Sequence, residues 1–196
     1  MFTWAKQLFV NKDQKKISLH HAIRYKPNMV PLLLEAGADL NSKNDDELMP
    51  VHFACQYQPN VVPLLLEAGA DPNSKDRHGW NTLHFACKYQ PSVVPLLLEA
   101  GADPNSKSIW GRISLHLACQ YQPSVVPLLL AAGADTNSKN NYEKTPLNYA
   151  CQYQPTVVSL LLKAVADSNS KDIDEEIIDL SNSEIEGSPA YMKIYG

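Results

Sequence analysis

The sequence predicts an all-α solenoid, and three observations lead to that fold class. A segment built around a histidine recurs every 32 residues, at His20, His52, His84 and His116, with Asn148 in the fifth place. Each copy is followed by a leucine-rich run with Pro near its start and, in the first four copies, Gly at its end, which is typical of a short helix. Tandem copies supply the continuous core that one unit of this size lacks.

The boundaries of the leucine-rich helix are predicted from one repeat position and its neighbours. Good N-cap residues recur there, namely Asn28, Asn60, Ser92, Ser124 and Thr156. Pro then falls in the first turn, where no helical bond is lost, and Gly follows the run as a left-handed C-cap. A helix of about nine residues results. In the fifth unit, Ser159 and Val165 replace Pro and Gly, so we expect a distorted or covered helix end.

Two motifs in each unit resemble the ankyrin-repeat family. The family mark Thr-Pro-Leu-His-x-Ala is matched by Asn81-Thr-Leu-His-Phe-Ala86 and its four counterparts, and each Leu-Leu-Leu-Glu-Ala-Gly-Ala-Asp run matches the helix end. The resemblance implies units of a β-turn finger and two antiparallel helices that stack on one another, an ankyrin-repeat solenoid. It covers five units, at 9–40, 41–72, 73–104, 105–136 and 137–168.

The two ends depart from the repeat. Residues 1–8 contain Phe2, Trp4 and Leu8, which predicts an N-terminal cap segment over the first unit. Asp172 and Glu175 form a capping-box pattern, so 169–181 is expected to contain a C-terminal capping helix. Residues 182–196 are expected to be a flexible acidic tail. An alternative is that this tail folds back over basic fingertips and competes with a partner.

Charge and hydropathy exclude several functional classes. The chain has 196 residues and a net charge of −4, and 7 of its 21 acidic residues lie after residue 171. The near-neutral body gives no basic face for nucleic acid. No run approaches the roughly 18 apolar residues of a membrane span, and the first ten residues read poorly as a secretory signal. We therefore predict a monomer in the cytoplasm or nucleus, without nucleic-acid or membrane partners.

Four cysteines and four histidines suggest a metal or catalytic site, but both sets follow the repeat. Cys55, Cys87, Cys119 and Cys151 recur every 32 residues, and stacked units are roughly 8–10 Å apart. This spacing is too wide for disulfides or a single zinc site. The resemblance implies that the repeated histidines bond neighbouring backbone, a role Asn148 can share. We predict no catalytic residue, no metal and no cofactor, hence no enzyme.

The units differ most in their fingers. Between units 41–72 and 73–104, 10 of 32 positions differ, and 8 of these lie at 44–51 against 76–83. The family resemblance implies a binding surface formed by the fingertips and the exposed face of the first helix. Large aromatics are candidate anchors, and charged residues tune complementarity. The predicted partner-binding residues are Asp45, Asp46, Arg77, His78, Trp80, Ile109, Trp110, Arg112, Tyr142 and Lys144. Alternatively, the aromatics only pack against the adjacent finger.

Two further rows run along the stack. Tyrosines recur near the end of the first helix, and Tyr57, Tyr89 and Tyr121 are further candidates for partner binding. Their constancy argues equally for packing. Lysines recur at the base of each finger, from Lys43 to Lys171, and at about a Debye length apart they are expected to be a solvated edge.

These features favour a protein–protein interaction module that docks a partner protein across its concave finger and first-helix surface. A narrower version inhibits the partner by occlusion. The alternative is an adaptor, or an effector acting in a host cytoplasm, in which the repeats recruit a target to other machinery.

Overall fold

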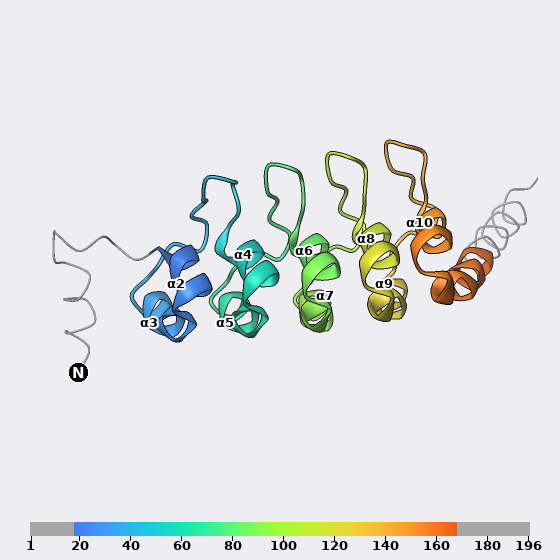
Figure 1. Cartoon of the computed structure of the whole chain (residues 1–196). Coiled ribbons are helices and arrows are strands. Elements are labelled where there is room, and N and C mark those ends of the chain that lie inside the picture. The colour runs from blue at the N-terminus through green and yellow to red at the C-terminus, as the bar shows by residue number, and fades with distance from the viewer. Residues whose placement is uncertain (1–17, 168–196) are drawn as a thin grey trace, which may run out of the picture.

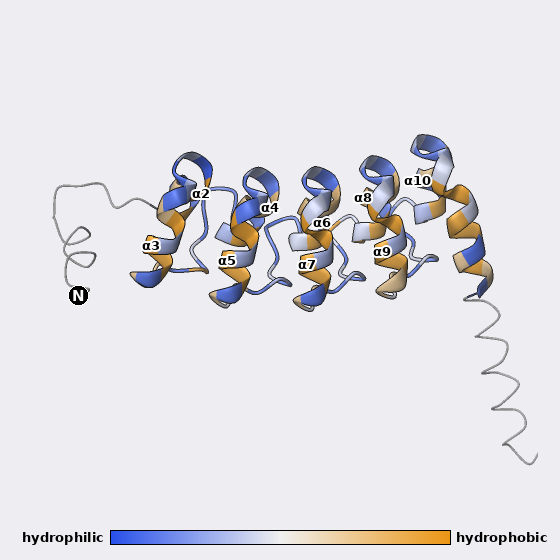
Figure 2. Cartoon of the chain, turned by 90° about the horizontal axis from the view of Figure 1, so that it is seen from below, coloured by the Kyte–Doolittle hydropathy of each residue, from blue (hydrophilic) through white to orange (hydrophobic). Residues whose placement is uncertain are grey.

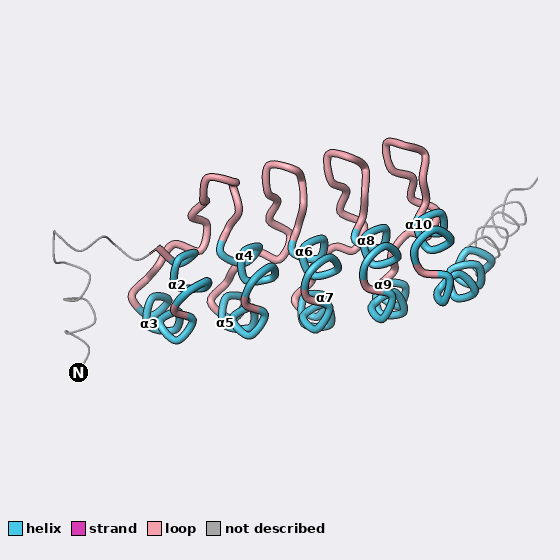
Figure 3. Tube along the Cα trace, viewed as in Figure 1, coloured by secondary structure: helices cyan, strands magenta, loops and turns pink. Residues whose placement is uncertain are grey.

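The computed structural model describes residues 18–167. The predicted cap segment 1–8, capping helix 169–181 and tail 182–196 lie outside the described residues. Within 18–167 the chain forms a row of antiparallel helix pairs separated by upright loops and contains no strand (Figures 1 and 3). The predicted all-α repeat solenoid is confirmed.

Each unit has the same order of elements. The first helices pack against one another along the row; they are α2 (Leu19–Tyr25), α4 (Pro50–Tyr57), α6 (Thr82–Tyr89), α8 (Ser114–Tyr121) and α10 (Pro146–Tyr153). Each second helix begins with a 3-10 turn: η1 (Pro27–Met29) precedes α3 (Val30–Glu35), η2 (Pro59–Val61) precedes α5 (Val62–Glu67), η3 (Pro91–Val93) precedes α7 (Val94–Glu99), and η4 (Pro123–Val125) precedes α9 (Val126–Ala131). In the fifth unit η5 (Pro155–Val157) leads into helical residues 158–167.

The predicted N-caps of the second helices are wrong. Asn28 and its counterparts lie inside the 3-10 turn, where no side-chain cap bond forms. The turn already begins at Pro27, whose fixed φ and missing N–H suit the first position. A single residue, Lys26, joins the two helices, and its N–H donates to Ala22 O at 2.8 Å. The C-caps are as predicted: Gly37 has φ +78°, and the N–H groups of Gly37 and Ala38 donate back to Leu34 O and Leu33 O.

The core is a repeating layer between the two helices of each unit and those of the next. Ala22, Ala54, Ala86, Ala118 and Ala150 are fully buried where the first helices approach most closely. Buried Val and Leu from the second helices complete each layer, as at Val94 and Leu97 of α7. Apolar bands therefore recur on every helix pair along the row (Figure 2). Each unit covers its neighbour's apolar face, which is why tandem copies are needed.

We call the loop tips between helix pairs fingers: the second finger is 44–48, the third 76–80, the fourth 108–112 and the fifth 140–144. Each closes with the same pair of backbone bonds, as in Asp76 N–H to Trp80 O and Gly79 N–H to Asp76 O. Glu47 (φ +59°) and Glu143 (φ +56°) hold the left-handed conformation that Gly79 and Gly111 adopt at +71°. The turn is thus the same in all four fingers and strained at both glutamates.

Neighbouring fingers are joined in two different ways. Ile109 N–H donates to His78 O, and Asn141 N–H donates to Trp110 O, each at 3.0 Å, so the third, fourth and fifth fingers are linked through their backbones. The second and third fingers share no such bond in the described chain and are joined by Arg77 Nη2 and Asp46 Oδ1 at 2.8 Å. A Cβ at Gly79 would lie 3.2 Å from Ile109 N, so glycine permits the close approach.

The thiols are not equivalent, although their sequence positions are. Cys55, Cys87 and Cys119 are buried, whereas Cys151 is exposed. Among residues 18–167 no unit follows the fifth to cover Cys151. Burial raises the pKa of Cys55 and of Cys119 to about 12 and raises that of Cys87 as well. These thiols form thiolates poorly and are packing groups.

Replacing Gly111 by Ala tests the finger contact. We expect Gly111→Ala and Gly133→Ala each to lower the free energy of unfolding by about 1–2 kcal/mol, because both glycines have positive φ. Gly133 faces open space, while a Cβ at Gly111 would lie 2.6 Å from Asn141 Oδ1 and 3.0 Å from Asn141 N. Gly111→Ala should therefore lower the free energy of unfolding, measured with urea, by about a further 1–3 kcal/mol. An equal decrease in the two variants would contradict the close contact between Gly111 and Asn141.

Thiol labelling tests the burial of the cysteines. Under native, reducing-agent-free conditions we expect one fast-reacting thiol, Cys151, and three that react only as the protein unfolds. Ellman's reagent followed by peptide mass spectrometry measures the number and the position. A Cys151→Ser variant, the matched control, should show no fast phase. Fast labelling of Cys55 or Cys87 in folded protein would contradict the packing described above.

Candidate functional site

Buried histidines fix the fingers to the first helices. His20 Nε2 lies 2.7 Å from Leu48 O, His84 Nε2 lies 2.9 Å from Arg112 O, and His116 Nε2 lies 3.0 Å from Lys144 O. His52 Nε2 instead lies 2.7 Å from Ser74 O, at the base of the third finger. A carbonyl only accepts, so Nε2 carries the proton and donates. These histidines are structural, as predicted from the repeat.

The second ring nitrogen bonds the residue that precedes the helix. Nδ1 of His52 and of His116 accepts the backbone N–H three residues earlier, each at 3.2 Å, and a second ring proton would break this bond. Nδ1 of His84 lies 3.2 Å from Asn81 N and 2.6 Å from Asn81 Oδ1. Burial lowers the pKa of all four histidines, that of His84 to about 4. In the fifth unit Asn148 Oδ1 accepts Thr145 N–H at 2.9 Å in the same way.

Trp80 is not the exposed fingertip anchor that the sequence predicts. Its ring is partly buried against the core, stacked 5.8 Å from the His84 ring and edge-on at 5.3 Å from Phe85. Its Nε1 is buried without a hydrogen-bond partner. The large apolar ring gains more by covering this first helix than by pointing into water. Trp80 therefore belongs to the floor of the site.

The other predicted fingertip aromatics do reach the surface. Trp110 is 36% exposed and stacks on His78 of the third finger, with ring centroids 5.2 Å apart. Tyr142 is 66% exposed and Ile109 is also exposed. Trp110 thus both packs against the adjacent finger and presents a free edge, whereas Tyr142 and Ile109 stand at the tips of their fingers.

The tyrosine row is a partly exposed surface stacked on other rings. Tyr57, Tyr89 and Tyr121 are 37–42% exposed. Tyr57 lies 4.6 Å from Phe53, and Tyr89 stacks 6.4 Å from Phe85. Packing along the helix therefore uses one face of each ring and leaves the rest accessible. The rings of the row are thus both packed and partly accessible.

Cations rest on these rings. The Arg24 guanidinium lies 4.4 Å from the Tyr57 centroid, and Lys88 Nζ lies 4.8 Å from Tyr89 and 5.2 Å from Trp80. At these separations the ring quadrupole attracts the charge. Arg112 lies over Tyr149 at 5.1 Å, further along the row. Each cation is held at the surface without an acidic partner among residues 18–167.

A groove of about 530 Å³ lies between two fingers and three first helices. The helices α2, α4 and α6 form the floor, and the second and third fingers form the wall, with Trp110 at the far end. The lining comprises Arg24, Asn44, Asp46, Leu48, Phe53, Gln56, Tyr57, Asp76, Arg77, His78, Trp80, Phe85, Lys88, Tyr89 and Trp110. The structure thus brings Asp46, Arg77, His78, Trp80, Trp110, Tyr57 and Tyr89 together. Asp45, Ile109, Arg112, Tyr121, Tyr142 and Lys144 do not line it.

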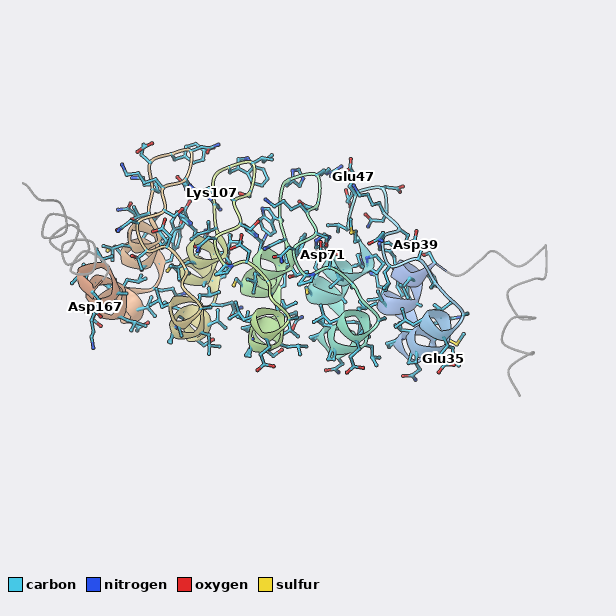
Figure 4. The ribbon with its side chains drawn as sticks, turned by 180° about the vertical axis from the view of Figure 1, so that it is seen from behind. Glu35, Asp39, Glu47, Asp71, Lys107 and Asp167 are labelled. Carbon is cyan, nitrogen blue, oxygen red and sulfur yellow. The ribbon has the colours of Figure 1, made fainter. Side chains whose placement is uncertain are left out.

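The acidic residues of the fingers are mostly neutralised. Asp46 pairs with Arg77, Glu47 with Lys43 at 3.3 Å, and Glu143 with Lys139 at 2.9 Å. Two members of the lysine row are therefore paired rather than simply solvated. Figure 4 places Glu47 at a fingertip and Glu35 at the opposite edge of the stack, so the two acids serve different faces.

The sequence interpretation missed eight residues of the groove: Arg24, Asn44, Leu48, Phe53, Gln56, Asp76, Phe85 and Lys88. The sequence held one signal. Only two differences between the second and third units fall outside 44–51 and 76–83, and one of them is Gln56 against Lys88. Phe53 and Phe85 share a repeat position with His21, Leu117 and Tyr149. Phe85, Leu117 and Tyr149 are buried at this position, and Phe53 is half-buried. His21 is exposed there and packs on Tyr25 at 5.0 Å.

The described residues contain no group of three or more His, Cys, Asp or Glu arranged to hold a metal ion. The buried histidines already use both ring nitrogens for backbone bonds. What the groove offers is rings, cations and hydrogen-bond donors. Between residues 18 and 167, no helix has the length and apolar character to cross a membrane.

Comparison with known families gives one result for the chain. The family model described as "Ankyrin repeats (3 copies)" matches residues 19–108 and, a second time, residues 106–172. Together the two matches span well over half of the sequence and include every helix of the described residues. None of the curated proteins compared with the chain matches it.

The buried histidines predict a pH dependence of stability. The pKa of His84 is lowered in the folded chain, so between pH 6.5 and about 4 the unfolded chain binds more protons. The stability that comes from the neutral ring is fully present above pH 6.5. As the pH falls below that value, the free energy of unfolding decreases by up to about 1.4 kcal/mol per pH unit for one histidine. His84→Asn should remove that share of the slope. His21→Asn, which replaces an exposed ring, should keep it.

Urea unfolding at pH 7.0, 6.0, 5.0 and 4.5 measures the slope. At pH 7.0 we expect His84→Asn to be less stable than the parent by about 1–3 kcal/mol, because the bond to Arg112 O is lost. At lower pH the two stabilities should converge. A parallel decline in His84→Asn and the parent protein would show that His84 is not held neutral.

Proposed function

Because the chain belongs to the ankyrin-repeat family, whose repeats generally mediate protein–protein interaction, we propose that it binds a partner protein in the groove over α2, α4 and α6. One observation carries the proposal: three adjacent first helices present exposed rings topped by cations that have no acidic partner in the described chain. Tyr, Trp and Arg are the residues most enriched at the energetic centres of protein interfaces.

The rings are pre-organised for binding. Tyr57 and Tyr89 are each supported on one face by a phenylalanine of the same helix. Trp110 is supported by His78. A side chain already held in place loses little rotamer freedom when a partner docks. Burying the exposed parts of these rings then contributes about 25 cal/mol per Å² of apolar surface.

The charges of the groove that have neither an ion-pair nor a hydrogen-bond partner in the described chain are positive. Finger acids are engaged in ion pairs or, like Asp76, accept backbone N–H groups of their own finger, at 2.8 Å from His78 N and Trp80 N. Arg24 and Lys88 remain available. A partner that supplies carboxylates satisfies both cations and is steered toward this end of the stack.

Groove variants test the proposal with the partner identified by mass spectrometry of material that co-purifies with the full-length chain. We expect Lys88→Glu to weaken binding about tenfold or more and Tyr89→Ala by a similar factor. Both side chains are at the surface, so thermal midpoints should stay close to that of the parent. Trp80→Ala is unsuitable, because that ring packs on the core.

Lys163→Glu is the matched control: Lys163 is an exposed residue of helical residues 158–167 and has the same charge change. Isothermal titration calorimetry of the purified pair should show parent-like affinity for this variant. If folded Lys88→Glu and Tyr89→Ala proteins bind as tightly as the control, the partner does not use the groove.

A further inference from the structure

Four cations along the binding side of the stack have no ion pair in the part of the chain that the structure describes. They are Arg24, Lys88, Arg112 and Lys144, and we call them the cation row. Arg24 and Lys88 line the groove. Arg112 and Lys144 occupy the repeat position of Trp80 in the next two fingers, beyond the end of the groove. The row therefore runs from the first unit to the fifth.

Aromatic rings alternate with these charges. Arg24 lies over Tyr57, Lys88 over Tyr89 and also 5.9 Å from Tyr121, and Arg112 over Tyr149. Rings thus contact three of the four cations, Arg24, Lys88 and Arg112. The matching ligand is a polypeptide segment in which carboxylates are interleaved with aliphatic side chains, since the first pair with the cations and the second cover the rings.

One segment of this chain has that composition. Residues 172–186 read Asp-Ile-Asp-Glu-Glu-Ile-Ile-Asp-Leu-Ser-Asn-Ser-Glu-Ile-Glu, with seven acids, five aliphatic residues and no Lys or Arg. All the acidic residues that follow residue 171 lie in it. The segment is thus opposite in charge to the cation row, and its aliphatic side chains complement the rings.

The chain is long enough to bring this segment to the row. The last described residue is Asp167, in the fifth unit, and residues 168–196 follow it. Extended at about 3.3 Å per residue, residues 168–186 span on the order of 60 Å, whereas four unit spacings of about 10 Å place the first unit roughly 40 Å away. Tethering of this kind gives effective concentrations in the millimolar range.

We propose that residues 172–186 occupy the cation row of their own chain, with carboxylates on Lys144, Arg112 and Lys88, and that a partner must displace them. This rests on the proposed function of the groove and adds its regulation. A partner with weak carboxylate content is excluded, while one with a more complementary acidic segment gains access. The tail thereby sets an affinity threshold.

Carbodiimide coupling of the dilute full-length protein tests the proposal, because it joins a carboxylate to a lysine amine only where the two touch. We expect intramolecular links from Lys88 and Lys144 to carboxylates within 172–186, identified by peptide mass spectrometry of the monomer. Lys43–Glu47 and Lys139–Glu143, at 3.3 and 2.9 Å, are internal positive controls.

Two double variants of equal charge change separate a specific contact from general attraction. Arg24→Glu with Lys88→Glu removes two members of the row, and we expect the yield of Lys144 links to fall at least threefold. Lys75→Glu with Lys107→Glu removes two exposed lysines at the finger bases (Lys107 in Figure 4) and should leave that yield unchanged. Circular dichroism checks that both proteins are folded.

Three results would overturn the proposal while the positive controls form: links from 172–186 to Lys163 alone, links only between two chains, or equal yields in the two double variants. Failure of the groove proposal looks different. If Lys88→Glu leaves partner affinity intact but the tail links form, the tail occupies a surface that the partner does not use. If Lys88→Glu weakens the partner and no tail links form, the groove binds only in trans.

Discussion

The hydrogen bond from a buried histidine to the backbone of the following finger is the contact on which the binding surface depends. It joins the floor of the groove to its wall, because His20 lies on α2 and Leu48 in the second finger. In His52, His84 and His116 the other ring nitrogen also bonds the residue at the start of the helix. Burial strengthens these bonds and lowers the pKa of the rings. The rings that line the groove, Trp80 among them, then pack onto this frame.

The sequence predicted the parts of the structure that are governed by local chemistry. Gly37 ends a helix because only glycine adopts its φ at little cost, and the 32-residue period places Ala86 and its counterparts where helices touch. The N-cap prediction failed at Asn28 for an equally local reason. Pro27, one residue earlier, starts the turn without any side-chain cap, and this preference outweighs that of the asparagine.

The parts that the sequence did not predict depend on tertiary contacts. Trp80 shares its repeat position with Leu48, Arg112 and Lys144, and this variety suggested an exposed site. Its ring nevertheless turns inward, because Phe85 and His84 of the same unit offer a surface beneath it. Cys151 is exposed although its sequence context matches that of Cys119. Packing within the unit decides the first outcome, and position within the stack decides the second.

The joint between the second and third fingers differs from the joints that follow it. Glycine at 79 and 111 lets the later fingers bond through their backbones, whereas Glu47 leaves only the exposed Arg77–Asp46 pair at the wall of the groove. Such a pair contributes about 0–1 kcal/mol and weakens as salt is added. Ionic strength therefore acts on the groove twice, by screening its unpaired cations and by loosening the wall beside them.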